Sequence, residues 1–148
     1  MKTLLIAHRG NILGPDEKNE NEPSYIINSI KEGFDCEVDL RYDNLSNQFY
    51  LGHDSNQYKI SKEWLLEYKD NLWIHCKDFD SLNILSLFDE SLNYFWHEND
   101  KFTLTSKGYI WTYPNNMTSK KSVIVSLGPE RPSEECFGIC SDYVQKLK

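Results

Sequence analysis

Short apolar runs interrupted or ended by polar residues recur along the chain, and they predict β-strands. The clearest run is FDCEVDL at 34–40, in which Glu37 and Asp39 stand among apolar residues. Because side chains on a strand alternate between its faces, these two carboxylates point the same way and the apolar residues between them point the other way. We therefore expect a buried strand with one acidic face. A solvated edge strand with two exposed acids is the alternative that this run alone leaves open.

Three stretches with helical patterns lie between the early strand candidates. Residues 23–33 begin with a proline and end at Gly33, the usual places for proline and glycine in a helix. Ser61 can cap a helix over 62–70, and residues 78–88 form a third apolar helical pattern. Further strands are expected at 3–7, 48–54, 71–77, 93–100, 109–114, 122–130 and 137–144.

The order of these elements predicts an α/β fold in a single domain over 1–148. Seven or eight strands, mostly parallel and with helices only after the early ones, favour a compact, partly helix-stripped TIM-type β/α barrel. An ordinary barrel of this type needs roughly 250 residues, so the 148-residue chain would be a reduced version. An open α/β sheet is the second hypothesis.

Charge and hydropathy exclude some classes of protein. The formal net charge is -7, and Lys120–Lys121 is the only adjacent pair of basic residues, which argues against a nucleic-acid binder. No apolar stretch is long enough for a signal peptide or a membrane span, so we expect no stable membrane insertion and a cytoplasmic location.

Polar residues gather where the predicted strands end. If the strands are parallel, these side chains meet at one edge of the sheet, which is where β/α barrels carry their active sites. Two carboxylates side by side are costly to bury without a positive partner, and a divalent cation is the simplest one. The residues at this edge are His8, Arg9, Glu37, Asp39, His53, Asp54, His75, Lys77 and His97.

Four motifs in this order resemble the glycerophosphodiester phosphodiesterases, which belong with the phosphatidylinositol-phospholipase-C-like phosphodiesterases. They are IAHRG, the EN pair at 20–21, GFDCEVDL and LGHD, and the resemblance covers about half of the chain, residues 3–77. It implies a TIM barrel, catalytic histidines at His8 and His53, metal-binding acids at Glu37 and Asp39, and a phosphate contact from Arg9.

The chain departs from the family pattern on one strand. The family has a glutamate there, followed two positions later by a lysine, and this sequence has His75 and Lys77. The resemblance implies Mg²⁺ or Ca²⁺, whereas an imidazole ligand at His75 also suits Mn²⁺ or Zn²⁺. We expect Arg9, Lys77 and Glu20 to bind substrate, with Glu22 as the alternative to Glu20.

These residues together predict a metal-dependent phosphodiesterase acting on a small phosphodiester, probably a glycerophosphodiester, by two-histidine acid–base catalysis. Two alternatives stay open. One is an inactive ligand-binding or regulatory domain on the same barrel. The other is a lyase that acts on phospholipid headgroups by transfer within the substrate.

Overall fold

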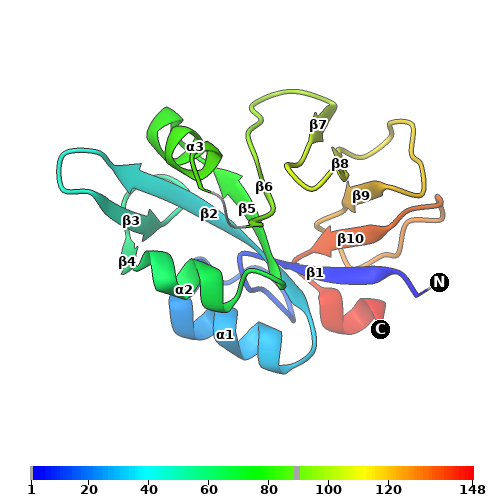
Figure 1. Ribbon diagram of the computed structural model, residues 1–148. Helices are drawn as coiled ribbons and strands as arrows, with labels where there is room; N and C mark the ends of the chain where they lie inside the picture. Colours follow the sequence, from blue (N-terminus) through cyan, green and yellow to red (C-terminus); the bar gives the residue numbers. More distant parts are fainter. Residues whose placement is uncertain (1, 89–90) are drawn as a thin grey trace.

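The computed structural model describes residues 2–88 and 91–148. One sheet of ten strands runs through the chain, with three α-helices and one short 3₁₀ helix beside it (Figure 1). The elements are β1 (Leu4–His8), α1 (Pro23–Lys31), β2 (Asp35–Asp43), β3 (Gln48–Leu51), β4 (Tyr58–Ile60), α2 (Lys62–Glu67), β5 (Leu72–Cys76), α3 (Phe79–Ser86), β6 (Tyr94–Phe95), β7 (Phe102–Leu104), β8 (Ile110–Thr112), β9 (Ser122–Val125), β10 (Gly138–Ser141) and η1 (Val144–Leu147).

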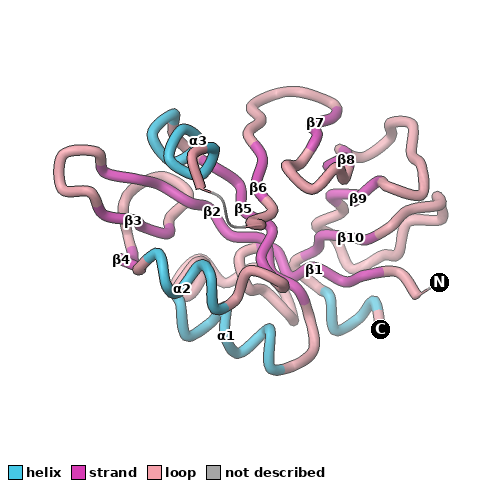
Figure 2. The backbone as a smooth tube through the Cα atoms, in the orientation of Figure 1, coloured by secondary structure: helices cyan, strands magenta, loops and turns pink. Residues whose placement is uncertain are grey.

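The sheet is a mixed, curled half-barrel, so the predicted TIM-type β/α barrel is wrong. Its main path runs β4-β3-β2-β1-β10-β9-β8-β7, and β5 and β6 branch from β2. The pairs β1–β2, β1–β10, β9–β10, β8–β9, β2–β5 and β5–β6 are parallel, whereas β2–β3, β3–β4 and β7–β8 are antiparallel. Helices do not alternate with strands beyond β6 (Figure 2).

The local sequence explains why the later connections in the described chain form loops. The segment after β8 contains Pro114 and two asparagines, of which Asn115 has a left-handed φ of 64°. The segment between β9 and β10 holds Pro129 and Pro132 beside Gly128. Proline and glycine disfavour helix interiors, so neither segment can supply the helix that a β/α barrel requires.

The three predicted helices are confirmed, and each is shorter than expected. Proline occupies the first turn of α1, where its missing N–H costs no hydrogen bond. The Ser61 hydroxyl accepts a hydrogen bond from the Trp64 N–H and caps α2, and the Asp78 carboxylate accepts one from the Ser81 N–H and caps α3. These caps fix where each helix begins against the sheet.

Two apolar cores lie on opposite faces of the sheet. The outer core packs Ile26 of α1, Leu65 of α2 and Leu85 of α3 against the strands. The inner core fills the concave face with large side chains, including Trp73, Phe95 and Trp111. The curl of the sheet therefore closes around an aromatic floor. Within the described residues no helix is long and apolar enough to cross a membrane.

Candidate active site

The candidate site lies on the concave face, directly beyond the inner core. Each polar residue follows an inner-core residue by two positions, on the same strand or just beyond its end, so the alternation of side chains sends both to the same face. The pairs are Ile6 and His8, Trp73 and His75, Phe95 and His97, Trp111 and Tyr113, and Cys140 and Asp142. The strands of this sheet thus place an apolar floor below and a polar layer above.

Two adjoining cavities open on this polar layer. One has a volume of about 420 Å³ and is lined by residues that include Asp39, His75, Lys77 and Tyr113. The other has about 520 Å³ and is lined by acidic and amide residues, Glu20 among them. Both cavities have His8, Arg9, His53 and Leu127 in their walls. The two predicted catalytic histidines therefore lie where two hollows meet.

Glu37 and Asp39 each use one carboxylate oxygen and leave the other facing His75. Glu37 Oε2 accepts the Arg9 backbone N–H at 3.3 Å, and Asp39 Oδ2 lies 2.9 Å from both the Asn21 amide and the Arg9 Nε. The Arg9 Nε contact is an ion pair without hydrogen-bond geometry. The remaining oxygens, Glu37 Oε1 and Asp39 Oδ1, lie 3.8 and 3.7 Å from His75 Nδ1.

His75 presents a lone pair to these two oxygens. Its Nε2–H donates to the backbone carbonyl of His97 at 3.4 Å, which fixes the tautomer and leaves Nδ1 without a proton. Burial, with the nearby Lys77 ammonium, lowers the pKa of His75 to about 3, so the ring is neutral at ordinary pH. Three acceptor atoms therefore face one another, and one ligand atom from each residue lies within 4.8 Å of the others.

The pKa values of the two buried acids, Glu37 and Asp39, shift in opposite directions. Burial and the adjacent Asp39 raise the pKa of Glu37 to about 7. Burial also acts to raise the pKa of Asp39, but the Arg9 guanidinium and the Asn21 amide outweigh it, so that pKa falls below its ordinary value. Near neutral pH the cluster can hold a proton on Glu37 or exchange it for a cation.

These three residues fit a divalent metal ion. Two carboxylate oxygens and one neutral imidazole nitrogen are all ligand atoms, and they converge from the neighbouring strands β2 and β5. Their separations of 3.7 and 3.8 Å exceed hydrogen-bond length, and ligand atoms about 2.0 to 2.2 Å from one ion would need only a small adjustment. Without a cation or a proton, the lone pairs in the cluster repel each other.

His8 is oriented by Asp142, a residue that the sequence analysis missed. The His8 Nδ1–H donates to Asp142 Oδ1 at 2.8 Å, and His8 Nε2 lies 3.8 Å from Glu37 Oε2. Burial lowers the pKa of His8, but the hydrogen bond to Asp142 and the Glu37 charge raise it by more, so the pKa lies above its ordinary value. Asp142 directly follows the parallel strand β10. The argument that polar residues at the ends of parallel strands meet at one edge of the sheet would therefore have found it.

Asn11 was also missed, and it ties the loop after β1 to the end of β10. Its fully buried amide donates to Asp142 Oδ1 at 2.8 Å and to Glu20 Oε1 at 2.9 Å, and its carbonyl accepts from the Tyr25 hydroxyl. Glu20 also accepts from Arg9 at 3.2 Å. Glu22, the alternative acid, instead pairs with a surface serine outside both cavities.

Arg9 and Asn21 adopt left-handed backbone conformations at φ values of 53° and 67°. Such values are uncommon for residues other than glycine and are concentrated at functional sites. The turn lets the Arg9 backbone bond to Glu37 while its side chain reaches Asp39 and Glu20. Asn21 holds Asp39 from both sides, because its carbonyl accepts the Asp39 N–H at 3.0 Å and its amide donates to Oδ2.

His53 reaches the site by a different route from the one predicted. It does not follow a parallel strand, because β3 runs antiparallel to β2 and returns to the level of Asp39, where the Gly52 N–H donates to the Asp39 carbonyl. Gly52 has a φ of 158°, and a Cβ there would lie 2.0 Å from the Ser55 carbonyl, so only glycine fits this turn. His53 Nδ1 bonds to Asp54 at 2.7 Å, and its side chain is 41% exposed.

Lys77, His97 and Tyr113 also line the 420 Å³ cavity. The His97 ring stacks on His75 with centroids 4.4 Å apart, and the Tyr113 hydroxyl donates a short hydrogen bond to His97 Nε2. The His97 Nδ1–H bonds to the Glu98 carbonyl, which makes Nε2 the acceptor. This aromatic and hydroxyl wall encloses the side of the site opposite Glu20.

Comparisons of the chain with protein-family models, with curated proteins and with solved structures found no match. The geometry described above is therefore the basis for a functional proposal.

Proposed function

We propose that this protein is a divalent-metal-dependent phosphodiesterase that acts on a small phosphodiester of the glycerophosphodiester type. The observation that carries the proposal is the convergence of Glu37 Oε1, Asp39 Oδ1 and His75 Nδ1 beside His8 and Arg9. The motif resemblance in the first half of the chain points to the same chemistry.

Glu37, Asp39 and His75 would hold the ion, which supplies Lewis-acid stabilisation of charge on phosphate oxygens when bound. The neutral imidazole at His75 favours Mn²⁺ or Zn²⁺ over Mg²⁺ and Ca²⁺, which prefer oxygen ligands. The second shell supports this assignment, because the His97 carbonyl orients His75 and Asn21 orients Asp39.

Arg9 and Lys77 would bind the phosphate through their positive charges. Both side chains line the 420 Å³ cavity, and Arg9 also lines its neighbour. Arg9 is held by Asp39 and Glu20 and so presents its guanidinium in a fixed orientation. A diester bound at their junction would send one alcohol arm into each cavity.

His8 and His53 would share proton transfer. The Asp142 hydrogen bond occupies His8 Nδ1 and leaves Nε2 to exchange a proton with the substrate. A raised pKa suits His8 to donate a proton to the leaving alcohol, and His53 would then accept one from the attacking hydroxyl. The exposed position of His53 gives it access to water or to a hydroxyl of the substrate.

The test is hydrolysis of a panel of glycerophosphodiesters with Mn²⁺, Zn²⁺, Mg²⁺, Ca²⁺ or EDTA, with His53→Ala as the control. We expect turnover that needs a divalent ion and falls by about 10² or more in the variant. A cyclic phosphate product would identify the transfer reaction of the lyase hypothesis. A folded protein that binds the ion and turns over no diester would contradict the proposal and favour the binding-domain hypothesis.

A further inference from the structure

The outer face of β7, β8 and β9 lacks the helical cover found elsewhere on the sheet. Figure 1 shows α1, α2 and α3 around the half of the sheet that contains β2 and β5, and no helix of the described residues lies over β7–β9. Cross-strand pairing joins Leu104 to Ile110 and Ile110 to Ser122, so these side chains share the outer face. Apolar groups on this face are left open to solvent.

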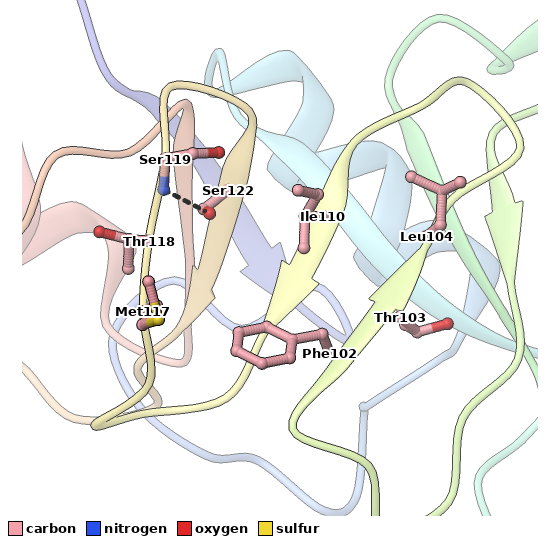
Figure 3. A pocket seen from close by; sticks show the side chains of 8 residues that line it. All are labelled: Phe102, Thr103, Leu104, Ile110, Met117, Thr118, Ser119 and Ser122. Carbon is pink, nitrogen blue, oxygen red and sulfur yellow. Dashed lines mark hydrogen bonds between the residues drawn. The ribbon is translucent and has the colours of Figure 1, made fainter.

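A groove of about 440 Å³ runs over this uncovered face. Figure 3 shows Phe102, Ile110 and Met117 beside one another along it, with Met117 carried by the loop between β8 and β9. The Ser119 N–H donates to the Ser122 hydroxyl at 2.9 Å and anchors that loop to β9. Met117 is 86% exposed, Leu104 68% and Phe102 43%, so three large apolar side chains project around one groove.

The same region carries positive charge in an otherwise acidic protein. Residues 101–129 contain four lysines and no aspartate or glutamate, whereas the whole chain has a formal net charge of -7. All four side chains are exposed; they are Lys101, Lys107, Lys120 and Lys121. Lys101, Lys120 and Lys121 directly adjoin groove-lining residues in the sequence, whereas the charge of Lys107 acts on the Asp35 carboxylate. This face therefore combines exposed apolar groups with a lysine-containing segment that has no acidic residue.

We propose that this face, defined by Phe102, Leu104, Ile110, Met117 and the adjoining Lys101, Lys120 and Lys121, docks on the surface of an anionic lipid bilayer. Methionine, leucine and phenylalanine side chains partition into the boundary between headgroups and acyl chains, and each nearby lysine adds attraction to anionic headgroups. Thr103, Thr118 and Ser119 also line the groove. The segment has no arginine for base or phosphate recognition, which favours a lipid surface over a nucleic acid.

Docking through this face would leave the candidate active site accessible. Among the described residues, the groove and the 420 Å³ cavity have no lining residue in common. The groove lies on the convex side of the sheet and the cavity on the concave side. Variants in the groove therefore test membrane docking without altering the residues assigned to hydrolysis.

The experiment is cosedimentation of the full chain with vesicles of equal parts phosphatidylglycerol and phosphatidylcholine, compared with phosphatidylcholine alone. We expect binding to the anionic vesicles that weakens at high salt, because screening removes the lysine contribution. Absence of binding to the anionic vesicles, or equal binding to neutral ones, would overturn the proposal.

Two variants and two matched controls assign the binding to this face. Met117→Asp and the double change Lys120→Glu with Lys121→Glu should each lower the vesicle partition coefficient by about tenfold or more. Leu45→Asp, at an apolar residue 97% exposed on the opposite half, and Lys31→Glu with Lys59→Glu should leave it nearly unchanged. If the groove variants bind like the original protein, the face is not the docking surface.

Light scattering of the same proteins separates lipid docking from self-association. A dimer that is lost in Met117→Asp, together with no vesicle binding, would overturn the proposal and make a second copy of the chain the occupant. A monomer that binds anionic vesicles and is released by Met117→Asp would support it.

Discussion

The two halves of the molecule solve the problem of covering a curled sheet in different ways. In residues 2–88, helices α1, α2 and α3 pack on the outer face, and the outer core is built from aliphatic residues such as Ile26, Leu65 and Leu85. In residues 91–148, the strands are joined by loops, and much of the packing lies on the inner face around Trp111 and Phe95. The first half resembles a β/α unit, whereas the second half consists of short strands joined by loops.

The difference places most of the candidate chemistry in the first half and its support in the second. Glu37, Asp39 and His75 come from β2 and β5, which the helices hold from behind. The second half contributes Asp142 to orient His8, and the His97 carbonyl to orient His75. A half-barrel therefore suffices to assemble the site, provided that β10 pairs with β1 and β6 with β5.

The largest effect is expected when the two proposed acidic metal ligands of the first half are removed. The double change Glu37→Gln with Asp39→Asn should abolish divalent-ion uptake and lower kcat by about 10³ or more, because the ligand charges and the stabilisation of phosphate charge are lost together. Calorimetric titration with Mn²⁺ and a hydrolysis assay measure the two effects. Glu22→Gln, at an acid outside both cavities, is the matched control, and unchanged ion uptake in the double variant would refute the assignment.

The histidines should show the next largest effect. His8→Ala and His53→Ala should each lower kcat by about 10² or more, as expected for general acid–base groups. Ion binding should persist in both, since neither is among the three ligand residues. Turnover close to that of the original protein in either variant would remove that histidine from the mechanism.

The contribution of the second half is tested by Asp142→Asn. Burial alone lowers the pKa of His8 and the Asp142 bond raises it, so the variant should titrate His8 at lower pH and lose about tenfold in kcat. NMR titration of the His8 ring and the pH profile of kcat measure the shift directly. A smaller kcat with no change in the His8 pKa would show that Asp142 only supports the loop held by Asn11.

Ion binding should depend on pH through Glu37, with a modest effect. Burial and Asp39 raise the pKa of Glu37 to about 7, so below pH 7 an ion must displace a proton, and affinity should fall by up to about tenfold per pH unit. His75, with a pKa near 3, contributes nothing in this range. Calorimetry at several pH values tests this, and an affinity that does not change between pH 6 and pH 8 would contradict it.

Glu37 and His75 act in opposite directions on the stability of the metal-free protein. The folded state holds the Glu37 proton more tightly than the unfolded chain, so the contribution of Glu37 to the free energy of unfolding should fall as pH rises from the ordinary glutamate pKa to about 7. The folded state holds a proton on His75 less tightly than the unfolded chain, so the contribution of His75 should rise up to the ordinary histidine pKa. Added Mn²⁺ should offset that fall. Urea unfolding with and without the ion provides the comparison, and the stability of the original protein relative to Glu37→Gln should fall with rising pH over this range.

Strand alternation was enough to predict much of the first half from the sequence. The two acids of β2 share a face because they are two positions apart, and the proline and glycine of the first helical pattern bracket α1. The barrel was wrong because strand-like segments do not reveal their direction: β3 returns antiparallel, and β7 and β8 form a hairpin without a helix. Asp142 and Asn11 meet across 131 positions of sequence, a contact that no local pattern contains.

The most direct test of the account is a crystal structure of the protein with Mn²⁺, examined by anomalous scattering. The account predicts one strong peak bounded by Glu37 Oε1, Asp39 Oδ1 and His75 Nδ1, at about 2.0 to 2.3 Å from each. A structure without a peak there, in which Glu37 is protonated and bonds directly to Asp39 or His75, would show that a proton satisfies the cluster and would contradict the proposed metal-dependent hydrolysis.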